Sequence, residues 1–422
     1  MLQNKFLVQY IVFPIWRLID VFISKDNNTW IFPVHFSDNK KFIENTRAVF
    51  EYVKKDTSIK KLIFIRSGYR SFQIEDAVNT EYVNIHSWKA LKYLWKARVI
   101  FLANAISWDL TFRWNDEKDF LILPLNLKRR VVVNLWHGIP LKKILNLWNP
   151  ELRRRYNRIN YRTYERKNYA IIPASSQIDA HVMANVFEPI SFHNILPTGL
   201  PRNDFLLQDE NQLPSYITNQ LLAIDEAIQD KKLILYAPTH RQTSLVEGSA
   251  YYEFTEEEVA KLKEVLKNNN AVLGIRMHYL RKGIDKMGAE KLIDREFIID
   301  VGNQLVPEIA PLIRKSTIVI TDYSSLYMDA MYLDKPVYSF AYDLEHYKNH
   351  QDGMIYDMEL AFPGPICTEF NELILSIESE LKKSYQVTTD KFKFTKKIFF
   401  DHIDKNNTSR LVKEVQSKLE KF

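Results

Sequence analysis

Short hydrophobic runs and longer amphipathic segments alternate along most of this chain. In the first half, the runs predict strands at residues 29–34, 61–66, 99–104, 130–136 and 169–173, and the amphipathic segments predict helices at 39–54, 91–97 and 151–167. In the second half, strands are predicted at residues 232–237, 271–277, 297–301, 317–321 and 337–340, and helices at 255–267 and 326–333. Strands that alternate with helices are typical of a parallel sheet that helices cover on both faces.

A polar segment at residues 208–215 interrupts this alternation, which then restarts. We therefore predict an α/β protein with two Rossmann-like, doubly wound domains facing a cleft, which is the GT-B architecture. The N-terminal domain is expected at residues 1–210, and the C-terminal domain, with the last helices, at residues 211–422. In open parallel sheets, ligands bind beyond the carboxyl ends of the strands. The residues that follow each strand are therefore the first candidates for a site.

The polar turn at residues 321–325 is the most informative of these strand ends. It lies between a predicted strand and a predicted helix, with Asp322, Ser324 and Ser325 at the helix start. Serine hydroxyls cap helices because they accept hydrogen bonds from free backbone N–H groups. The same N–H groups and the positive helix end can bind a phosphate group. The pattern alone leaves both interpretations open, a plain helix cap or an anion site.

Three other strand ends carry basic or hydroxyl-bearing residues. His137 follows the last long strand of the first half, and an imidazole can accept a proton near neutral pH as a general base. Thr239 and Arg241 follow the first strand of the second half, and Arg276 and His278 lie at the end of the next one. Each of these side chains also has an ordinary structural role, in a salt bridge or a hydrogen bond. Together, three basic strand ends and a serine-capped helix suit the binding of a pyrophosphate.

Composition excludes several kinds of site. No two glycines are spaced as G-x-G, and the segment from Gly283 to Gly288 continues with Ala289 rather than lysine, so neither a dinucleotide-binding nor a Walker-type loop is predicted. The single cysteine, Cys367, excludes an internal disulfide and a thiolate zinc cluster, and is typical of a reducing compartment. The formal net charge of +6 favours anionic partners.

Several short motifs follow one another along the chain in a recognisable order. They are WHGIPLK at residues 136–142, TGLPRND at 198–204, YAPTHR at 236–241, TDYSS at 321–325, KPV at 335–337, AYDLEHY at 341–347 and FPGPI at 362–366. In this order they resemble the CDP-glycerol glycerophosphotransferase family, whose members make teichoic acids and capsule polymers. Two positions depart from the family pattern: Tyr279 stands where the family has proline after the second histidine, and Asp352 stands where it has arginine before Gly353.

The resemblance implies a transferase that moves glycerol phosphate, or ribitol phosphate, from a CDP-alditol donor to a lipid-linked or polymeric acceptor. The acceptor hydroxyl would attack the β-phosphorus and release CMP. The two functional histidines of the family fall on His137, implied as the general base, and on His278, implied as a donor to the phosphate or leaving group. The residues implied for the donor in the C-terminal domain are Thr239, Arg241, Arg276, Asp322, Ser324 and Ser325. No cofactor is firmly implied, and a divalent cation stays open.

Two segments bear on the expected location of the protein at a membrane. Residues 6–23 are apolar but too often interrupted by polar residues for a membrane span, and they suit either an interfacial helix, anchored by Trp16 and Phe22, or packing on the core. The basic region at residues 151–167 suits an anionic membrane surface, although an ordinary solvated helix face has the same pattern. We expect a peripheral protein on the cytoplasmic face of the cell membrane, with no nucleic acid as partner.

Two other functions are compatible with the same pattern. One is a GT-B glycosyltransferase or sugar-nucleotide epimerase that uses a UDP donor. The other is a non-catalytic, glycan-binding relative, against which the intact His137 and the serine pair at 324–325 argue. The same residues are compatible with a glycerol or a ribitol donor, and with a primase or a polymerase activity.

Overall fold

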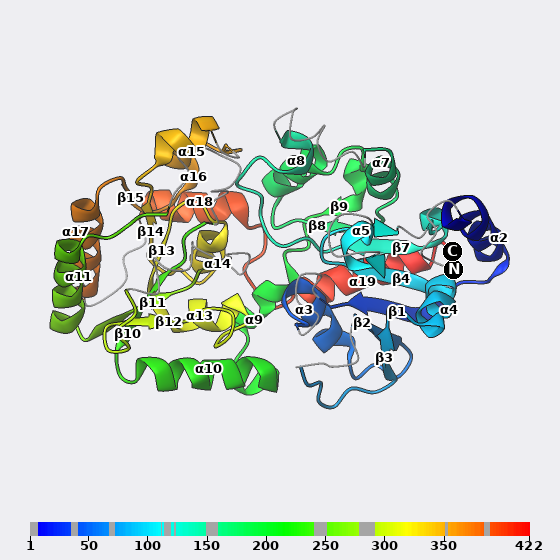
Figure 1. Ribbon diagram of the computed structural model, residues 1–422, viewed down its shortest axis with the longest axis horizontal. Helices are drawn as coiled ribbons and strands as arrows, with labels where there is room; N and C mark the ends of the chain where they lie inside the picture. The colour runs from blue at the N-terminus through cyan, green and yellow to red at the C-terminus, as the bar shows by residue number, and fades with distance from the viewer. Residues whose placement is uncertain are drawn as a thin grey trace. The chain divides into compact units, whose positions relative to one another are not determined.

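The computed structural model describes residues 7–34, 41–66, 72–110, 112–113, 120–121, 124–148, 159–239, 251–277, 292–350, 353–383 and 389–422. The chain divides into two compact units (Figure 1). The first comprises Met1–Gly138, Tyr156–Asp204 and Asn406–Phe422, and the second comprises Ile139–Arg155 and Phe205–Lys405. This division differs from the expected one at residue 210 in three segments. Residues 139–155 and 205–210 belong to the second unit, and the C-terminal segment after Lys405 belongs to the first.

The first unit is built on a parallel sheet with the strand order β3-β2-β1-β4-β7. Its strands are β1 (Asp26–Pro33), β2 (Lys60–Ile65), β3 (Thr80–Asn84), β4 (Ala97–Leu102) and β7 (Val131–Asn134). Ile31 of β1 pairs with Leu62 on one side and Ile100 on the other, and all three side chains are fully buried. Short pairs are formed by β5 (Phe112–Arg113) with β6 (Phe120–Leu121), and by β8 (Ile172–Pro173) with β9 (Ile195–Leu196). The doubly wound topology predicted for this half is confirmed.

Helices bury the strand side chains of this sheet. The described helices of the first unit are η1 (Val8–Val12), α2 (Phe13–Phe22), α3 (Glu44–Val53), α4 (Trp88–Lys96), α5 (Ile106–Asp109), η2 (Leu127–Arg129), α7 (Ile159–Lys167), α8 (Gln177–Val186), η4 (Phe192–Asn194), η5 (Pro201–Asn203) and α19 (Asn407–Leu419). Phe50 of α3 and Leu411 of α19 join Phe32 and Phe101 of the sheet in one core, where the Phe32 and Phe101 rings stack 4.8 Å apart. Helices from both ends of the chain therefore complete this unit.

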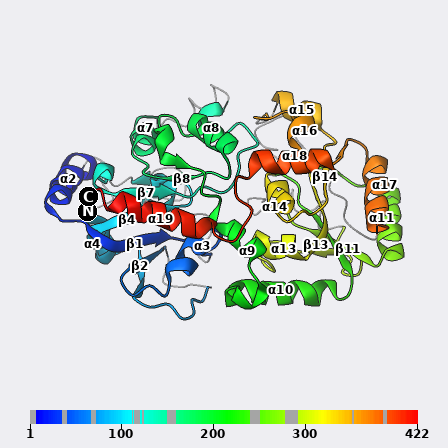
Figure 2. The ribbon, with the colours of Figure 1, turned by 180° about the vertical axis from the view of Figure 1, so that it is seen from behind.

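The last helix, α19, lies against the first unit (Figure 2), and residues of the TGLPRND motif hold it there. The Asp204 carboxylate accepts hydrogen bonds from the backbone N–H groups of Asn407 and Thr408, both at 2.9 Å. Gly199 has a φ of +79°, and a Cβ there would lie 1.8 Å from Asn407 Oδ1. These two motif residues therefore attach the C-terminal helix, which is a structural role.

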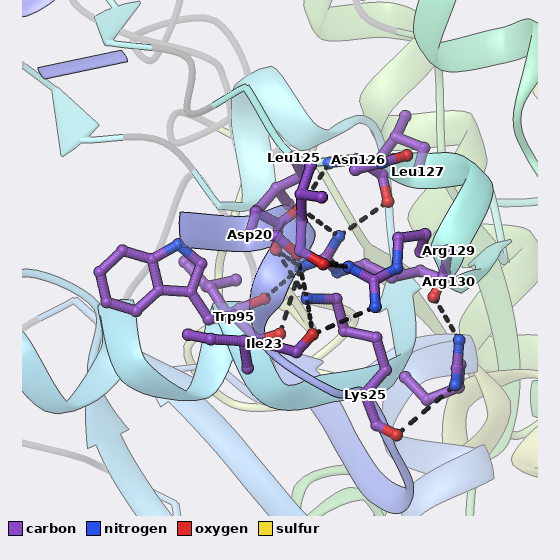
Figure 3. Close-up of polar contacts among 12 residues, drawn as sticks. Asp20, Ile23, Lys25, Trp95, Leu125, Asn126, Leu127, Arg129 and Arg130 are labelled. Atoms are coloured by element: carbon purple, nitrogen blue, oxygen red, sulfur yellow. Dashed lines mark hydrogen bonds and ion pairs between the residues drawn. The ribbon is translucent and has the colours of Figure 1, made fainter. Parts of the chain in front are cut away.

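Helix α2 is joined to the same unit by a buried cluster of charges (Figure 3). Asp20 accepts from Arg130 Nη1 at 3.0 Å and from Lys25 Nζ at 2.9 Å. Burial opposes the charge on Asp20, but the hydrogen bonds and positive charges of Arg130 and Lys25 bring its pKa below the ordinary value. Burial lowers the pKa of Lys25 to about 8. Arg129 donates to the carbonyl oxygens at the end of the helix, those of Asp20, Val21 and Ile23.

The two faces of α2 differ in burial. Trp16 is buried and stacks on Trp95 of α4 with ring centroids 4.3 Å apart, so its predicted role as an interfacial anchor is wrong. Phe22, the other predicted anchor, is 79% exposed. The helix therefore packs on the core with one face and presents apolar side chains with the other. Within the described ranges, no helix is long and apolar enough to cross a membrane.

The second unit contains a parallel sheet with the strand order β12-β11-β10-β13-β14-β15. Its strands are β10 (Lys232–Tyr236), β11 (Ala271–Ile275), β12 (Ile298–Asp300), β13 (Ser316–Thr321), β14 (Val337–Phe340) and β15 (Ile366–Cys367). Its described helices are η3 (Leu145–Leu147), α9 (Asp204–Leu207, which begins at the last residue of the first unit), η6 (Glu210–Gln212), α10 (Ser215–Ile228), α11 (Glu256–Asn268), α13 (Ile309–Lys315), α14 (Leu326–Tyr332), α15 (Leu344–His350), α16 (Met358–Ala361), α17 (Phe370–Leu381) and α18 (Asp390–Phe399). Leu266 of α11 and Ile374 of α17 pack against Ile234 and Ile320 of the sheet. This unit confirms the second predicted Rossmann-like domain.

Candidate functional site

In the first unit, polar residues that follow two neighbouring strands meet at the carboxyl edge of the sheet. The strand order reverses between β1 and β4, which is where such sheets bind ligands. Asn104 comes after β4 and His137 after β7. His137 Nε2 lies within hydrogen-bonding distance of Asn104 Oδ1, and His137 Nδ1 lies 3.4 Å from Glu44 Oε2. The side chain of His137 is 34% exposed, so the predicted general base is held by two polar partners and still open to a substrate.

Two residues at the contact between His137 and Glu44 have a left-handed backbone conformation. Trp136 has a φ of +51° and Glu44 a φ of +59°. Such angles cost a residue other than glycine about 1–3 kcal/mol, and they are found mainly where the surroundings enforce them. Asn45 provides part of that restraint, because its Nδ2 donates to the carbonyl oxygens of Leu135 at 3.3 Å and Trp136 at 3.0 Å. The turn that carries the histidine is thus tied to the start of α3.

Two buried carboxyl groups lie behind Asn104. Asp109 accepts from the backbone N–H of Asn104 at 2.7 Å and from its Nδ2 at 3.3 Å. Burial raises the pKa of Asp109, and these hydrogen bonds oppose that shift. Glu165 accepts from the backbone N–H of Ile106 at 2.6 Å and from the Tyr169 hydroxyl at 2.5 Å. Burial raises the pKa of Glu165 to about 7.

In the second unit, two predicted site residues meet where the strand order reverses between β10 and β13. Thr239 follows β10 and Asp322 follows β13. Asp322 Oδ1 accepts from the backbone N–H of Thr239 at 2.8 Å and from that of Tyr323 at 2.5 Å, and Thr239 and Asp322 are both buried. These contacts hold the two strand-end loops together.

The predicted serine pair lies at the start of α14. Ser325 is the N-cap residue, and its side chain makes no capping hydrogen bond. Ser324 Oγ accepts from the backbone N–H of Leu326 at a long 3.4 Å. Both serines are partly exposed. The plain-cap interpretation therefore applies weakly to Ser324 and not to Ser325.

Of the remaining predicted site residues, the structure describes Arg276. The Arg276 guanidinium donates to four oxygen atoms of one loop: the carbonyls of Val301, Val306 and Pro307, and the side chain of Asn303. Their distances lie between 2.6 and 3.2 Å, so Arg276 braces this loop. Arg241 and His278 lie outside the described residues. In the part of the chain that is described, no group of three or more His, Cys, Asp or Glu side chains is placed to hold a metal ion.

Sequence reasoning missed four polar residues around His137: Glu44, Asn104, Asp109 and Glu165. A signal existed for Asn104, because it was the last residue of a predicted strand and thus at a carboxyl end. The others reach the site through the fold. Glu165, for example, meets the backbone of Ile106 across 59 positions of sequence.

Comparison with known proteins adds the following. The profile of the family described as CDP-glycerol:poly(glycerophosphate) glycerophosphotransferase matches residues 17–417. The teichoic acid poly(glycerol phosphate) polymerase of Bacillus spizizenii is 28% identical over 429 residues, covering 98% of this chain and 99% of that protein. The teichoic acid glycerol-phosphate transferase of Staphylococcus aureus is 28% identical over 384 residues, covering 89% of each. The solved structure of the wall teichoic acid polymerase TagF has a similar fold, with a TM-score of 0.70 at 21% identity, over 99% of this chain and 96% of that one.

Proposed function

Because the chain belongs to the CDP-glycerol:poly(glycerophosphate) glycerophosphotransferase family, we propose that it transfers glycerol phosphate, or ribitol phosphate, from a CDP-alditol to a lipid-linked or polymeric acceptor. The product would be a teichoic acid-like or capsule polymer, and CMP would be released. The observation that carries this proposal is the placement of His137 at the carboxyl edge of its sheet, with polar partners at both ring nitrogens. Such an imidazole is suited to take a proton from an acceptor hydroxyl.

Phosphoryl transfer requires mainly that the reacting groups are held in position and that the charge of the transition state is stabilised. His137 takes the proton of the acceptor hydroxyl while the hydroxyl oxygen bonds to the β-phosphorus. The bond from that phosphorus to the CMP oxygen breaks, and its electron pair stays on CMP. We assign His278 to the phosphate or the leaving group, on the resemblance alone.

The second unit is proposed to bind the donor, and the first to bind the acceptor. Ser324 and Ser325 are the strongest candidates for the pyrophosphate, since their hydroxyls stand at the start of α14 with little use as caps. The backbone N–H of Thr239 donates to Asp322, which lies in the same turn as the two serines. Arg241 is proposed as a further phosphate ligand. Arg276 is the weaker candidate, because its guanidinium already donates hydrogen bonds to oxygen atoms of a loop.

The test is to incubate the purified chain with CDP-glycerol, CDP-ribitol or a UDP-sugar, together with lipid-linked or short polymeric acceptors. Each mixture is run with and without a divalent cation, and the released nucleotide is identified. We expect CMP from a CDP-alditol. UDP without CMP would point instead to a glycosyltransferase or epimerase, and donor binding without any release would point to a non-catalytic relative.

We propose further that the protein works at the cytoplasmic face of the membrane as a peripheral protein. The support comes from the outward side of η1 and α2, whose large apolar side chains are each at least half exposed: Tyr10, Ile11, Ile15, Leu18, Val21 and Phe22. Helices with such a face lie in membrane interfaces. The basic region at 151–167 is the second candidate, and residues 151–158 of it lie outside the described part. Within the remainder, Arg166 lies over the Phe187 ring at 6.0 Å, so it is turned toward the protein.

A further inference from the structure

The partners of His137 determine which of its ring nitrogens carries the proton. A neutral imidazole has one N–H and one bare nitrogen, and the hydrogen bond at one nitrogen selects the role of the other. Nε2 lies against the side-chain amide of Asn104, and Nδ1 faces Glu44. An amide can present either an oxygen or an N–H group. The Glu44 carboxylate can only accept, but its contact of 3.4 Å is the longer of the two, so the orientation of the Asn104 amide has the larger influence on which nitrogen carries the proton.

Asp109 fixes that orientation. Its two carboxylate oxygens accept from the backbone N–H and from Nδ2 of Asn104. An ionised carboxylate can only accept, so the amide nitrogen has to face Asp109 and the amide oxygen has to face His137. The reverse orientation would set two oxygens against each other. Asn134 Nδ2 also donates to the backbone carbonyl of Asn104 at 2.8 Å, which fixes the main chain at this residue, and Asp109 is only 2% exposed.

We propose that Asn104 and Asp109 are positioning residues that hold the neutral His137 with its proton on Nε2 and leave Nδ1 as the basic nitrogen. The inference rests on the proposed role of His137 as general base. It places the acceptor hydroxyl at Nδ1, on the side of Glu44. The hydroxyl proton then moves to Nδ1 as the new O–P bond forms and the bond to CMP breaks with its electrons on CMP.

Glu44 has a defined part in this arrangement. After proton transfer, the ring is a cation that donates from Nε2 to Asn104 and from Nδ1 to Glu44, 3.4 Å away. The single proton of the acceptor hydroxyl goes to Nδ1, so the task of the Glu44 carboxylate, which is 30% exposed, is to stabilise the cation once it has formed. An Nε2 base would have its lone pair directed at the Asn104 amide oxygen, which already occupies the position that a substrate hydroxyl would need. The two sides of the ring therefore have different tasks.

A spectroscopic test needs no turnover. The full chain, labelled with ¹⁵N-histidine, is studied by long-range ¹H–¹⁵N correlation at mildly alkaline pH, and the His137 signals are assigned by their loss in His137→Gln. We expect the wild type to show the proton on Nε2. In Asn104→Ala the preference for Nε2 is expected to weaken, and in the control Asn185→Ala, an exposed amide on α8, it should not change. A wild-type ring with its proton on Nδ1 would overturn the proposal.

A kinetic test separates positioning from folding. Asn104→Ala is expected to lower kcat by between about 10-fold and 10⁴-fold, as for groups that orient a base, with the KM for the donor little changed. Asp109→Asn, which allows the amide to rotate, should give a smaller fall in kcat and the same weakened Nε2 preference. Wild-type kcat in Asn104→Ala would contradict the proposal. If instead His137→Ala stays active, the proposed general base is wrong. The NMR experiment still tests separately which ring nitrogen carries the proton.

Discussion

The Asp20 carboxylate and the Arg130 guanidinium form a buried pair, with Nη1–Oδ2 and Nη2–Oδ1 distances of 3.0 and 2.5 Å. Both residues are at most 2% exposed. Arg130 also donates to the carbonyl oxygens of Leu94 and Asn126, at 2.8 and 2.7 Å. Helix α2, helix α4 and the loop before β7 therefore meet at one guanidinium, and the apolar outer face of α2 is presented from a rigid base.

Replacing Arg130 by leucine should destabilise the first unit strongly. The change leaves the Asp20 carboxylate buried without its main partner, which typically costs about 3–5 kcal/mol. The measurement is urea unfolding followed by tryptophan fluorescence. Lys382→Ala is the control, because this lysine and its partner Glu378 are far more exposed, and such pairs contribute about 0–1 kcal/mol. A loss below about 1 kcal/mol in Arg130→Leu would show that the buried pair contributes little net stability.

Glu165 should make the stability of the first unit depend on pH. Burial raises its pKa to about 7 in the folded protein, whereas an unfolded glutamate has a pKa of about 4.3. A raised folded pKa means that its contribution is complete below the unfolded value and is lost as the pH rises through 7.

The variant Glu165→Gln removes this titration. Its melting temperature relative to the wild type should rise between pH 5 and pH 8, whatever the absolute difference at either pH. Glu420→Gln, at the exposed end of α19, is the matched control and should show no such trend. A constant difference across this pH range would mean that Glu165 stays ionised throughout.

Hydrophobic periodicity predicted the strands because buried parallel strands are continuous apolar runs, as in β14, whose bounds Val337–Phe340 match the prediction. It missed β3, because the residues Thr80–Asn84 are mostly half-buried and polar. The strand-end rule selected His137 as a candidate, and it selected Thr239 and Asp322 separately, which the structure joins by a hydrogen bond. It could not locate Asp109 or Glu165, because burial and contacts made by the fold, not a local pattern, bring them together. The place of α19 was missed for the same reason.

Replacing His137 by alanine should nearly abolish turnover. Loss of a general base lowers the rate by about 10²–10⁴. Donor binding should persist, because the proposed donor residues are in the other unit. CMP release gives kcat, and calorimetry with CDP-glycerol gives Kd. The exposed His181, whose Nδ1 lies 2.8 Å from the carbonyl oxygen of Gln177, provides the control variant His181→Ala. If His137→Ala keeps more than about a tenth of the wild-type kcat, another group is the base.

The double variant Ser324→Ala with Ser325→Ala should weaken binding of the CDP donor without unfolding the chain. Their hydroxyls stand at the start of α14, where a phosphate can also meet backbone N–H groups. Calorimetry measures the affinity, and circular dichroism checks the fold. Ser417→Ala, exposed on α19, is the control. Unchanged donor affinity with an intact fold would remove the pair from the donor site.

The outer face of α2 should hold the protein on membranes. The triple variant Ile15→Asn, Leu18→Asn and Phe22→Asn replaces side chains that are 53%, 60% and 79% exposed, so the fold should tolerate it. In vesicle flotation, we expect the wild type to rise with vesicles that contain anionic lipids, and the variant to remain in the bottom fraction.

A matched control keeps the number and kind of substitutions and moves them to the second unit. Leu222→Asn, Leu360→Asn and Leu375→Asn replace side chains that are 66%, 78% and 61% exposed, and this variant should still float. Salt separates the two candidate surfaces, because charge attraction is screened at high ionic strength and apolar insertion is not. If the α2 variant floats like the wild type, but salt or neutralisation of Arg153, Arg154, Arg155 and Arg158 releases it, the basic region is the attachment site and α2 is not.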